Sequence, residues 1–384
     1  MAPNLGWRVL GETVRGASHV RAGLPNQDAI AWRAARGHDL PLMLVVSDGH
    51  GSAKSFRSDR GSRMAVEVTV GLLTELVSGL PGQGRLSIVK RAAEEPLPKE
   101  LVRRWQVAVD ADLEADPFSD GELATLRDRR GERGCAAVAR NPRLAYGATV
   151  LGVLVTADYL LFLQLGDGDL LTVAADGEVT RPLVRDERLI ANETTSLCMD
   201  DAWREVRMRF LTKHVSYPAL IVAATDGYAN SFVNDAAFRQ VGSDLLGLLR
   251  EEGIETVKAS LPGWLEEASA SGSGDDISVG LVVRADALPV TASADPATLP
   301  LAPPAPEDQS DVLENDGGLS VDEELSVTGD GDDDPEARAR FVARIKHEGP
   351  SEPAKRVGLQ QAVADDPDAT GDVAGPVPEP NAVG

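Results

Sequence analysis

Four acidic sites of this chain share one setting, an aspartate beside glycine next to a short apolar run typical of a buried strand. They are Ser47-Asp48-Gly49-His50 after residues 41–46, Gly166-Asp167-Gly168 after 160–165, Thr225-Asp226-Gly227 after 220–224, and Gly274-Asp275-Asp276 before 277–283. If the strands share a sheet or a sandwich, these carboxylates meet at one edge. Carboxylates gathered in this way repel one another unless divalent cations neutralise them, so the pattern predicts a metal centre.

Each Asp-Gly pair taken singly fits an ordinary turn, because both residues adopt turn conformations for backbone reasons. Asp176-Gly177, after the run 170–173, is interpreted in that way as a hairpin turn. Because Asp beside Gly recurs at several strand ends, a functional role is favoured for the aspartates at the other sites. Asp28 belongs with them, because it ends the Gly- and Pro-containing loop 16–28 and precedes a strand at 29–33.

The elements that must position these side chains follow from apolar periodicity. Strands are predicted at residues 5–15, 29–33, 41–46, 148–155, 160–165, 170–173, 219–224 and 277–283. Helices are predicted over 53–77, 101–113 and 235–268, the last broken at Pro262. The three strands that follow Gly147 are predicted to form an antiparallel meander. Residues 80–96 are punctuated by Pro and Gly, and the charged stretch 115–140 is interpreted as a variable insertion.

The charge of the chain is unevenly distributed. The 384 residues carry a net charge of −23, and residues 291–384 hold 21 of the 61 acidic residues but only 6 of the 38 basic ones. We therefore expect one domain over residues 1–288 and an acidic, Pro-rich disordered tail over 289–384, with a short helix near 335–347. The acidic excess argues against nucleic acid or an anionic membrane as the main partner.

The sequence favours a cytoplasmic protein. Its two cysteines, Cys135 and Cys198, are too few for a disulfide framework and have no metal-ligand spacing. Charged residues interrupt the apolar positions of residues 1–20, unlike a signal peptide. No apolar stretch approaches the roughly 20 residues that a membrane helix needs.

Six segments, in this order, resemble the motif series of the PP2C-type metal-dependent protein serine/threonine phosphatases. They are Pro25-Asn-Gln-Asp28, Val46-Ser-Asp-Gly-His-Gly51, Gly147-Ala-Thr149, Leu165-Gly-Asp-Gly168, Ala224-Thr-Asp-Gly227 and Gly274-Asp-Asp-Ile-Ser-Val279. The resemblance covers roughly residues 6–285, and Asp-Gly-His-Gly is its most specific part. Each motif alone is weak, whereas six in family order are strong.

Carried over residue by residue, the resemblance implies a binuclear metal centre. Asp28 and Asp48 would hold it with the carbonyl of Gly49, and Asp226 and Asp275 would complete it. Asp167 resembles the aspartate that helps hold a third, weaker metal in many bacterial members. Hard oxygen ligands suit Mn²⁺ or Mg²⁺, and the lack of Cys or His clusters disfavours zinc.

The resemblance also implies two catalytic residues. His50 resembles the general acid that protonates the leaving seryl or threonyl oxygen; the alternative is a histidine that merely caps a turn. The family's phosphate-binding arginine usually lies five residues before the first aspartate, where this chain has Gly23. Arg21 and Arg15 are the nearest candidates, and Arg21 is preferred.

Three further positions depart from the family pattern. Gln27 replaces the usual Glu before Asp28; it carries no charge but can still accept a hydrogen bond from a metal-bound water. Gly168 replaces Ser, and Asp276 replaces Asn. Since every expected aspartate is present, these departures resemble a divergent bacterial branch of the family more than an inactive enzyme.

The resemblance implies an α/β architecture, a central antiparallel β-sandwich flanked by helices on both sides, with the metals at one end. It implies hydrolysis of phosphoserine and phosphothreonine by a water that the two metals activate. Phosphorylated proteins are then the substrates, a cognate serine/threonine kinase is an expected partner, and a monomer is the expected state. No nucleic acid or membrane partner is expected.

Two other functions remain open from the sequence. One is a catalytically weak regulatory module that binds phosphopeptides or metal, with the acidic tail docking a partner; Gln27 and the displaced arginine keep this possibility open. The other is a metal-dependent hydrolase of small phosphoesters, which the sequence separates poorly from a protein phosphatase.

Overall fold

The computed structural model of the protein describes residues 6–34, 40–79, 86–185, 194–212 and 217–289. All of these residues belong to one compact unit. The segment predicted as an acidic tail, with its short helix near 335–347, lies outside the described residues from residue 290 onward.

The described residues form two five-stranded sheets, which we call the first and second sheets. The first sheet has the order β1 (Trp7–Val14), β10 (Ile277–Arg284), β9 (Leu220–Ala224), β6 (Asp169–Val173) and β7 (Val179–Thr180). The second has the order β2 (Ala29–Ala34), β3 (Leu42–Ser47), β4 (Val150–Val155), β5 (Tyr159–Leu165) and β8 (Arg207–Thr212). All neighbouring strands are antiparallel, as predicted.

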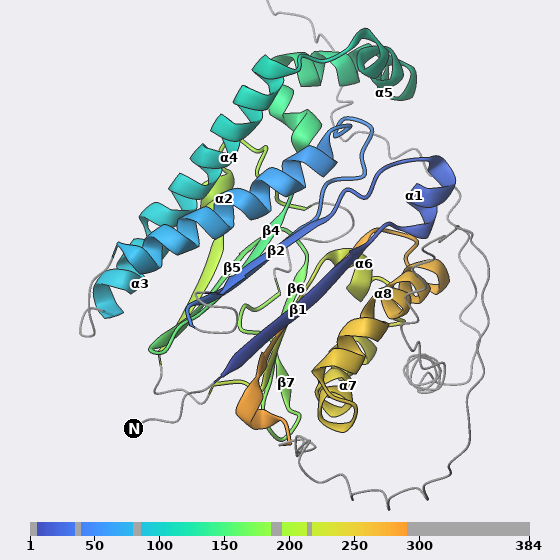
Figure 1. The fold of residues 1–384 in the computed structure, drawn as a ribbon. Helices are drawn as coiled ribbons and strands as arrows, with labels where there is room; N and C mark the ends of the chain where they lie inside the picture. The colour runs from blue at the N-terminus through green and yellow to red at the C-terminus, as the bar shows by residue number, and fades with distance from the viewer. Residues whose placement is uncertain (1–5, 35–39, 80–85, 186–193, 213–216, 290–384) are drawn as a thin grey trace, which may run out of the picture. The chain divides into compact units, whose positions relative to one another are not determined.

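Helices cover both outer faces of this pair of sheets, which confirms the predicted architecture (Figure 1). The helices on the side of the second sheet are α2 (Ser58–Ser78), α3 (Leu86–Glu94), α4 (Pro96–Ala115) and α5 (Asp120–Arg140). Those on the side of the first sheet are α7 (Asp235–Glu251) and α8 (Ile254–Ser271). Short helices are α1 (Ala17–Ala22), α6 (Asp226–Ala229), η1 (Pro142–Tyr146), η2 (Ala202–Arg204) and η3 (Ala285–Ala287).

Three apolar clusters hold these layers together. One lies between the sheets, a second between the first sheet and α7 and α8, and a third between the second sheet and α2, α3 and α4. In β3 successive side chains alternate between clusters, with Leu44 between the sheets and Met43 and Val45 toward the helices. Because both faces of such strands are buried, they appear in the sequence as continuous apolar runs, and this made them predictable.

The predicted meander after Gly147 is wrong in its third strand. β4 and β5 pair with each other in the second sheet, but β6 pairs with β9 and β7 in the first. The chain therefore passes from one sheet to the other at Gly166-Asp167-Gly168. The hairpin turn at Asp176-Gly177 is confirmed, since it joins β6 to β7 and Gly177 has a φ of 92°.

Several helices differ from the prediction. α1 lies within the stretch predicted as a loop, α3 lies within the punctuated stretch 80–96, and α5 occupies most of the expected insertion. α5 begins with a capping box between Ser119 and Glu122, and few of its residues are buried, which explains its weak apolar periodicity. The break expected at Pro262 falls instead at Gly253, whose φ of 85° separates α7 from α8.

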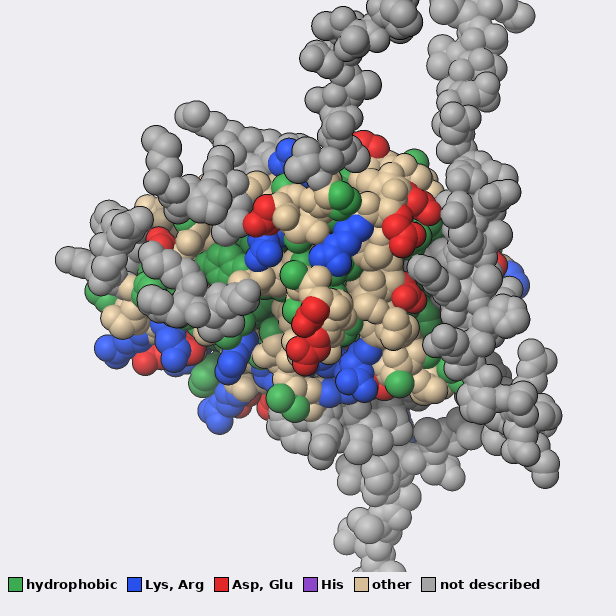
Figure 2. Space-filling view, turned by 90° about the horizontal axis from the view of Figure 1, so that it is seen from below, with side chains coloured by type: hydrophobic (Ala, Val, Ile, Leu, Met, Phe, Trp, Pro, Cys, Tyr) green, Lys and Arg blue, Asp and Glu red, His purple; other side chains and the backbone are tan. Residues whose placement is uncertain are grey.

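The surface mixes both signs of charge where the described residues can be seen in Figure 2. Lys and Arg side chains there lie interspersed with Asp and Glu side chains, so this face offers no continuous basic patch for a nucleic-acid backbone. Within the described ranges, no helix has the length and apolar character required to span a bilayer.

Two glycines of α2 differ sharply in their surroundings. A Cβ at Gly61 would overlap the carbonyl oxygen of Tyr146, where η1 crosses the helix, and the carbonyl of Gly61 accepts a hydrogen bond from Trp105 Nε1 at 3.0 Å. A Cβ at Gly71 would meet no atom within 4 Å. Only Gly61 is therefore required by packing.

We expect Gly61→Ala to lower the free energy of unfolding by about 1–3 kcal/mol, because the backbone of η1 must move. Gly71→Ala in the same helix should raise it by about 0.5–1 kcal/mol, because alanine favours a helix over the unfolded chain. Urea unfolding followed by circular dichroism measures both. Equal effects at the two positions would contradict the close approach at Gly61.

Candidate metal centre

The strand directions bring the predicted aspartates to one edge of the sandwich. β3 and β5 are both antiparallel to β4, so their ends, followed by Asp48 and Asp167, lie at the same edge. β2 begins where β3 ends, which places Asp28 there as well. In the first sheet β10 begins where β9 ends, so Asp226 and Asp275 are neighbours.

Three of these side chains form one compact group. Asp48, Asp167 and Asp226 each offer a carboxylate oxygen, and the three oxygens lie within 4.8 Å of one another. One comes from the second sheet, one from the passage between the sheets and one from the start of α6. Separations of this size allow the three carboxylates to share a cation.

Asp28 lies beside this group and is held by specific hydrogen bonds. Its side chain accepts a hydrogen bond from Thr225 Oγ1 at 2.7 Å, and its backbone N–H donates to Asn26 Oδ1 at 3.0 Å. Only 7% of Asp28 is exposed. Burial raises the pKa of this carboxyl well above its ordinary value, and the charges of Asp276 and Asp226 raise it further.

Mutual repulsion connects the remaining carboxylates. Burial raises the pKa of Asp48 well above its ordinary value, and the nearby charges of Asp226, Asp28 and Asp275 add to this rise. Burial and the charge of Asp167 raise the pKa of Asp226 to about 6. Negative charges gathered in this way are costly by themselves and are stabilised by a bound cation.

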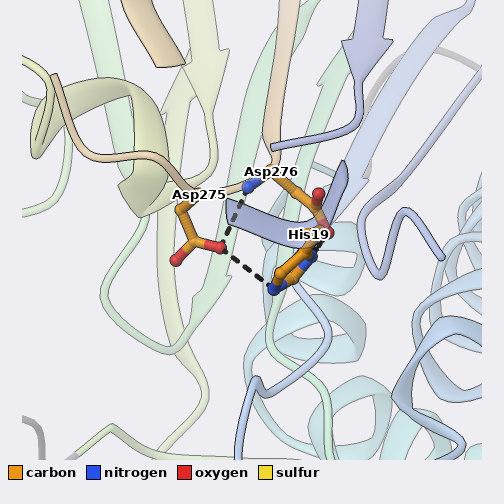
Figure 3. Close-up of side chains that lie close together, drawn as sticks. All are labelled: His19, Asp275 and Asp276. Carbon is orange, nitrogen blue, oxygen red and sulfur yellow. Dashed lines mark hydrogen bonds and ion pairs between the residues drawn. The ribbon is translucent and has the colours of Figure 1, made fainter. Parts of the chain in front are cut away.

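The structure places Asp275 in an adjacent group rather than in the compact one. Its carboxylate lies with His19 and Asp276 (Figure 3). About half of the Asp275 side chain, 52%, is exposed. Although the side chain is half exposed, the partial desolvation of its carboxyl raises its pKa, and the charge of Asp276 adds to this rise while His19 opposes it. The predicted ligand set therefore consists of three clustered aspartates, Asp28 beside them and Asp275 at the rim.

Two backbone and side-chain features fit a metal in this place. Gln27 Oε1 is buried and accepts no hydrogen bond from the described residues, as expected of an acceptor meant for a metal-bound water. Gly49 lies so close to the carbonyl of Gln27 that a Cβ would overlap it. This close approach joins the Asp48 loop to the backbone just before Asp28. The residues present fit hard, oxygen-bound divalent cations.

His50 lies at the edge of the acidic group. Its backbone N–H donates to the carbonyl of Gly147 at 3.0 Å, and its ring lies so near Gly147 that a Cβ there would clash. Burial lowers the pKa of His50, and the charge of Asp167 opposes this effect. Burial alone would leave less of this imidazole protonated at neutral pH, and the charge of Asp167 favours the protonated form that a general acid needs.

The two candidate arginines are less clearly placed. Arg21 is an exposed residue of α1, and Arg15 is exposed just before that helix. Among the described residues neither has a hydrogen-bond or ion-pair partner for its guanidinium. α1 itself is anchored beside Asp275, because Ser18 donates hydrogen bonds from its backbone N and its Oγ to the Gly274 carbonyl.

Several residues that the sequence did not single out support the site. Thr225 binds Asp28, Thr194 Oγ1 donates to Asp167 at 2.9 Å, and Thr149 Oγ1 accepts from the Asp48 backbone at 3.1 Å. Thr225 and Thr149 lie within two of the six family motifs, so the sequence offers a way to find them. His19 lies in a stretch predicted as a loop, where no motif points to it.

The sequence profile of the protein phosphatase 2C family matches residues 15–266, more than half of the chain. This chain therefore belongs to the protein phosphatase 2C family. It is also 28% identical over 200 residues to serine/threonine-protein phosphatase 3 of Escherichia coli (strain K12). That alignment covers 52% of this chain and 65% of the relative, slightly less than two thirds of the relative's length.

Two solved structures are also similar. The catalytic domain of the serine/threonine protein phosphatase PstP in complex with manganese ions is 18% identical, with 73% of this chain and 98% of that chain covered and a TM-score of 0.44. Serine/threonine phosphatase Stp1 from Staphylococcus aureus is 13% identical, with 74% and 98% covered and a TM-score of 0.43.

The raised carboxyl pKa values predict how the metal-free protein responds to pH. Asp226 titrates near 6 in the folded chain and near 3.8 when unperturbed, so between these values the folded state binds more protons. The contribution of Asp226 to stability without metal should therefore rise as the pH falls from about 7 to about 4. Thermal unfolding in EDTA across this range measures the effect.

Asp226→Asn is the matched variant for this measurement. It should be more stable than the parent at neutral pH without metal, with a flatter pH dependence, because one repelling charge is gone. Added Mn²⁺ should stabilise the parent more than the variant. A parent protein whose metal-free stability falls on acidification through pH 6 would contradict the repulsion described here.

Proposed function

We propose that this chain is a metal-dependent protein phosphatase that hydrolyses phosphoserine and phosphothreonine. The observation that carries the proposal is the meeting of Asp48, Asp167 and Asp226 within 4.8 Å, with Asp28 hydrogen-bonded beside them. These are the aspartates that the family pattern assigns to metal binding. Membership of the protein phosphatase 2C family gives independent support.

The proposed cofactors are two Mn²⁺ or Mg²⁺ ions and a third at a weaker site. Asp28, Asp48, Asp226 and Asp275 would hold the pair with the Gly49 carbonyl, and Asp167 would hold the third. The supporting observation is that the clustered donors are carboxylate oxygens, which these hard cations prefer. When bound, such a pair lowers the pKa of a water molecule and offsets charge on the phosphoryl oxygens.

The chain's own residues have separate tasks in this proposal. The buried Gln27 Oε1 is free to accept a hydrogen bond from water at the centre. His50 donates a proton from its ring to the departing seryl or threonyl oxygen, and the nearby charge of Asp167 favours the protonated ring that this step needs. No side chain has to form a covalent phosphoenzyme.

The direct test is turnover of a phosphothreonine peptide and of p-nitrophenyl phosphate with Mn²⁺, with Asp48→Ala as the control. The proposal expects metal-dependent hydrolysis of both by the parent chain and none by the variant. Metal binding without turnover would favour a regulatory module instead. Turnover of small esters only, with no phosphopeptide hydrolysed, would favour a small-molecule phosphatase.

His50→Gln should separate proton donation from the rest of the reaction. For the phosphothreonine peptide, whose alkoxide leaving group needs a proton, kcat should fall by about 10²–10⁴-fold. For p-nitrophenyl phosphate, whose leaving group departs as a stable anion, kcat should change far less. Steady-state kinetics on both substrates checks this, and equal losses on both would remove His50 from the role of general acid.

Arg21 is our proposal for the group that binds the substrate phosphate. It is supported by the anchoring of α1 beside the loop that carries Asp275. Arg21→Ala should raise KM for the phosphopeptide about tenfold, the loss of one charge-assisted hydrogen bond, with kcat little changed. Arg15→Ala is the matched control with an expected KM near that of the parent. If only Arg15→Ala raises KM, the assignment passes to Arg15.

The substrates, partner and compartment complete the proposal. Phosphorylated proteins are the substrates, a serine/threonine kinase acts in opposition, and the chain works as a monomer in the cytoplasm. Family membership supports the first of these, and the thiols of Cys135 and Cys198, both free, agree with a reducing compartment. Affinity capture that recovers no kinase or kinase substrate would count against the partner.

A further inference from the structure

One buried carboxylate joins the two segments that carry Asp28 and Asp275. Asp276 is 3% exposed, and its oxygens accept three hydrogen bonds, from Gly16 N at 2.6 Å, Gln27 N at 2.6 Å and His19 Nδ1 at 2.8 Å. Gly16 and Gln27 lie near opposite ends of the loop that leads to Asp28. The loop is therefore fastened to the start of β10 at both of its ends.

Asp276 and His19 also orient Asp275. The backbone N–H of Asp276 donates to Asp275 Oδ1 at 2.9 Å, and His19 Nε2 lies 3.8 Å from that same oxygen (Figure 3). His19 itself is 8% exposed, so its ring has little freedom to turn away. The imidazole thus has one nitrogen on Asp276 and the other facing the rim carboxylate.

The three side chains do not form a cation site of their own. His19, Asp275 and Asp276 lie close enough together to hold an ion, but both oxygens of Asp276 are already occupied by N–H donors. A cation on Asp276 would have to displace these buried hydrogen bonds, which is costly. Their chemistry therefore fits the support of a neighbouring site.

The backbone around this unit is closely packed. A Cβ at Gly16 would overlap the backbone of Asp275, and Ala17 N donates to Ser269 Oγ, which in turn donates to the Asp275 carbonyl at 2.8 Å. A change at His19 or Asp276 would therefore be transmitted to the placement of Asp275 and Asp28 rather than absorbed by a loose loop.

We propose that His19 and Asp276 are a positioning pair that sets the spacing of Asp28 and Asp275 and thereby the affinity of the centre for divalent cations. The catalytic consequence rests on the proposed function, but the effect on metal affinity does not. Removing a side chain that holds a metal ligand in place by a hydrogen bond typically weakens metal binding by about 10–100-fold.

The test compares Mn²⁺ binding by isothermal titration calorimetry of the full chain with three variants. His19→Leu removes both ring nitrogens, and Asp276→Asn replaces one acceptor oxygen by a donor. Both should weaken Mn²⁺ binding by about 10–100-fold. His19→Asn keeps an N–H in the position of Nδ1, so it should restore most of the affinity lost in His19→Leu.

A matched control separates positioning from general stability. Glu122→Gln weakens the pair of Glu122 with the buried Arg57, whose Nε lies 2.6 Å from Glu122 Oε1 and which belongs to neither acidic group. This variant should lose stability to urea in EDTA without a change in Mn²⁺ affinity. His19→Leu and Asp276→Asn should lose affinity beyond any such loss of stability.

Two results would overturn the proposal. One is His19→Leu with the Mn²⁺ affinity of the parent but lower stability in EDTA, which would leave the pair a purely structural role. The other is a loss of affinity in His19→Asn as large as in His19→Leu, which would mean that the hydrogen bond from Nδ1 to Asp276 does not set the affinity. Failure of the phosphatase assignment looks different, because the parent chain would then bind Mn²⁺ without hydrolysing phosphopeptide while the affinity differences persisted.

Discussion

The repulsion between buried carboxylates is the constraint on which this structure depends. Burial and neighbouring charge raise the pKa of Asp28, Asp48 and Asp226 together, so the fold holds them against their own electrostatics. The three apolar layers of the sandwich provide the stability that makes this possible. Hydrogen bonds from Thr225 and Thr194 fix individual carboxylates at the shared edge.

Much of the fold could be predicted from the sequence because its central strands are buried on both faces. Continuous apolar runs such as β3 and β9 can be identified as strands without knowing which strands pair with them. Sheet membership could not be predicted in the same way, since β6 pairs with β9 across about fifty intervening residues rather than with the adjacent β5. α5 was missed because it is charged on most faces and buries few side chains.

The metal centre likewise has residues that could be predicted from the sequence and contacts that could not. Its aspartates were predictable, because an apolar run next to Asp and Gly can be recognised from adjacent residues of the sequence alone. The His19–Asp276 contact was not, because the two residues are 257 positions apart and neither has a local pattern that implies the other. The departure of Asp276 from the family's usual Asn is explained by the structure, since a carboxylate can accept hydrogen bonds from Gly16, His19 and Gln27 at once.

The passage of the chain between the sheets at Gly166-Asp167-Gly168 has a mechanical consequence. Asp48 follows a strand of the second sheet, Asp226 follows a strand of the first, and Asp167 lies in the segment that connects β5 to β6. Ions held by these three aspartates would link the two sheets at their shared edge. Binding of the ions would then strengthen the packing of the two sheets against each other. Loss of an ion would weaken that packing first at the edge where the aspartates meet.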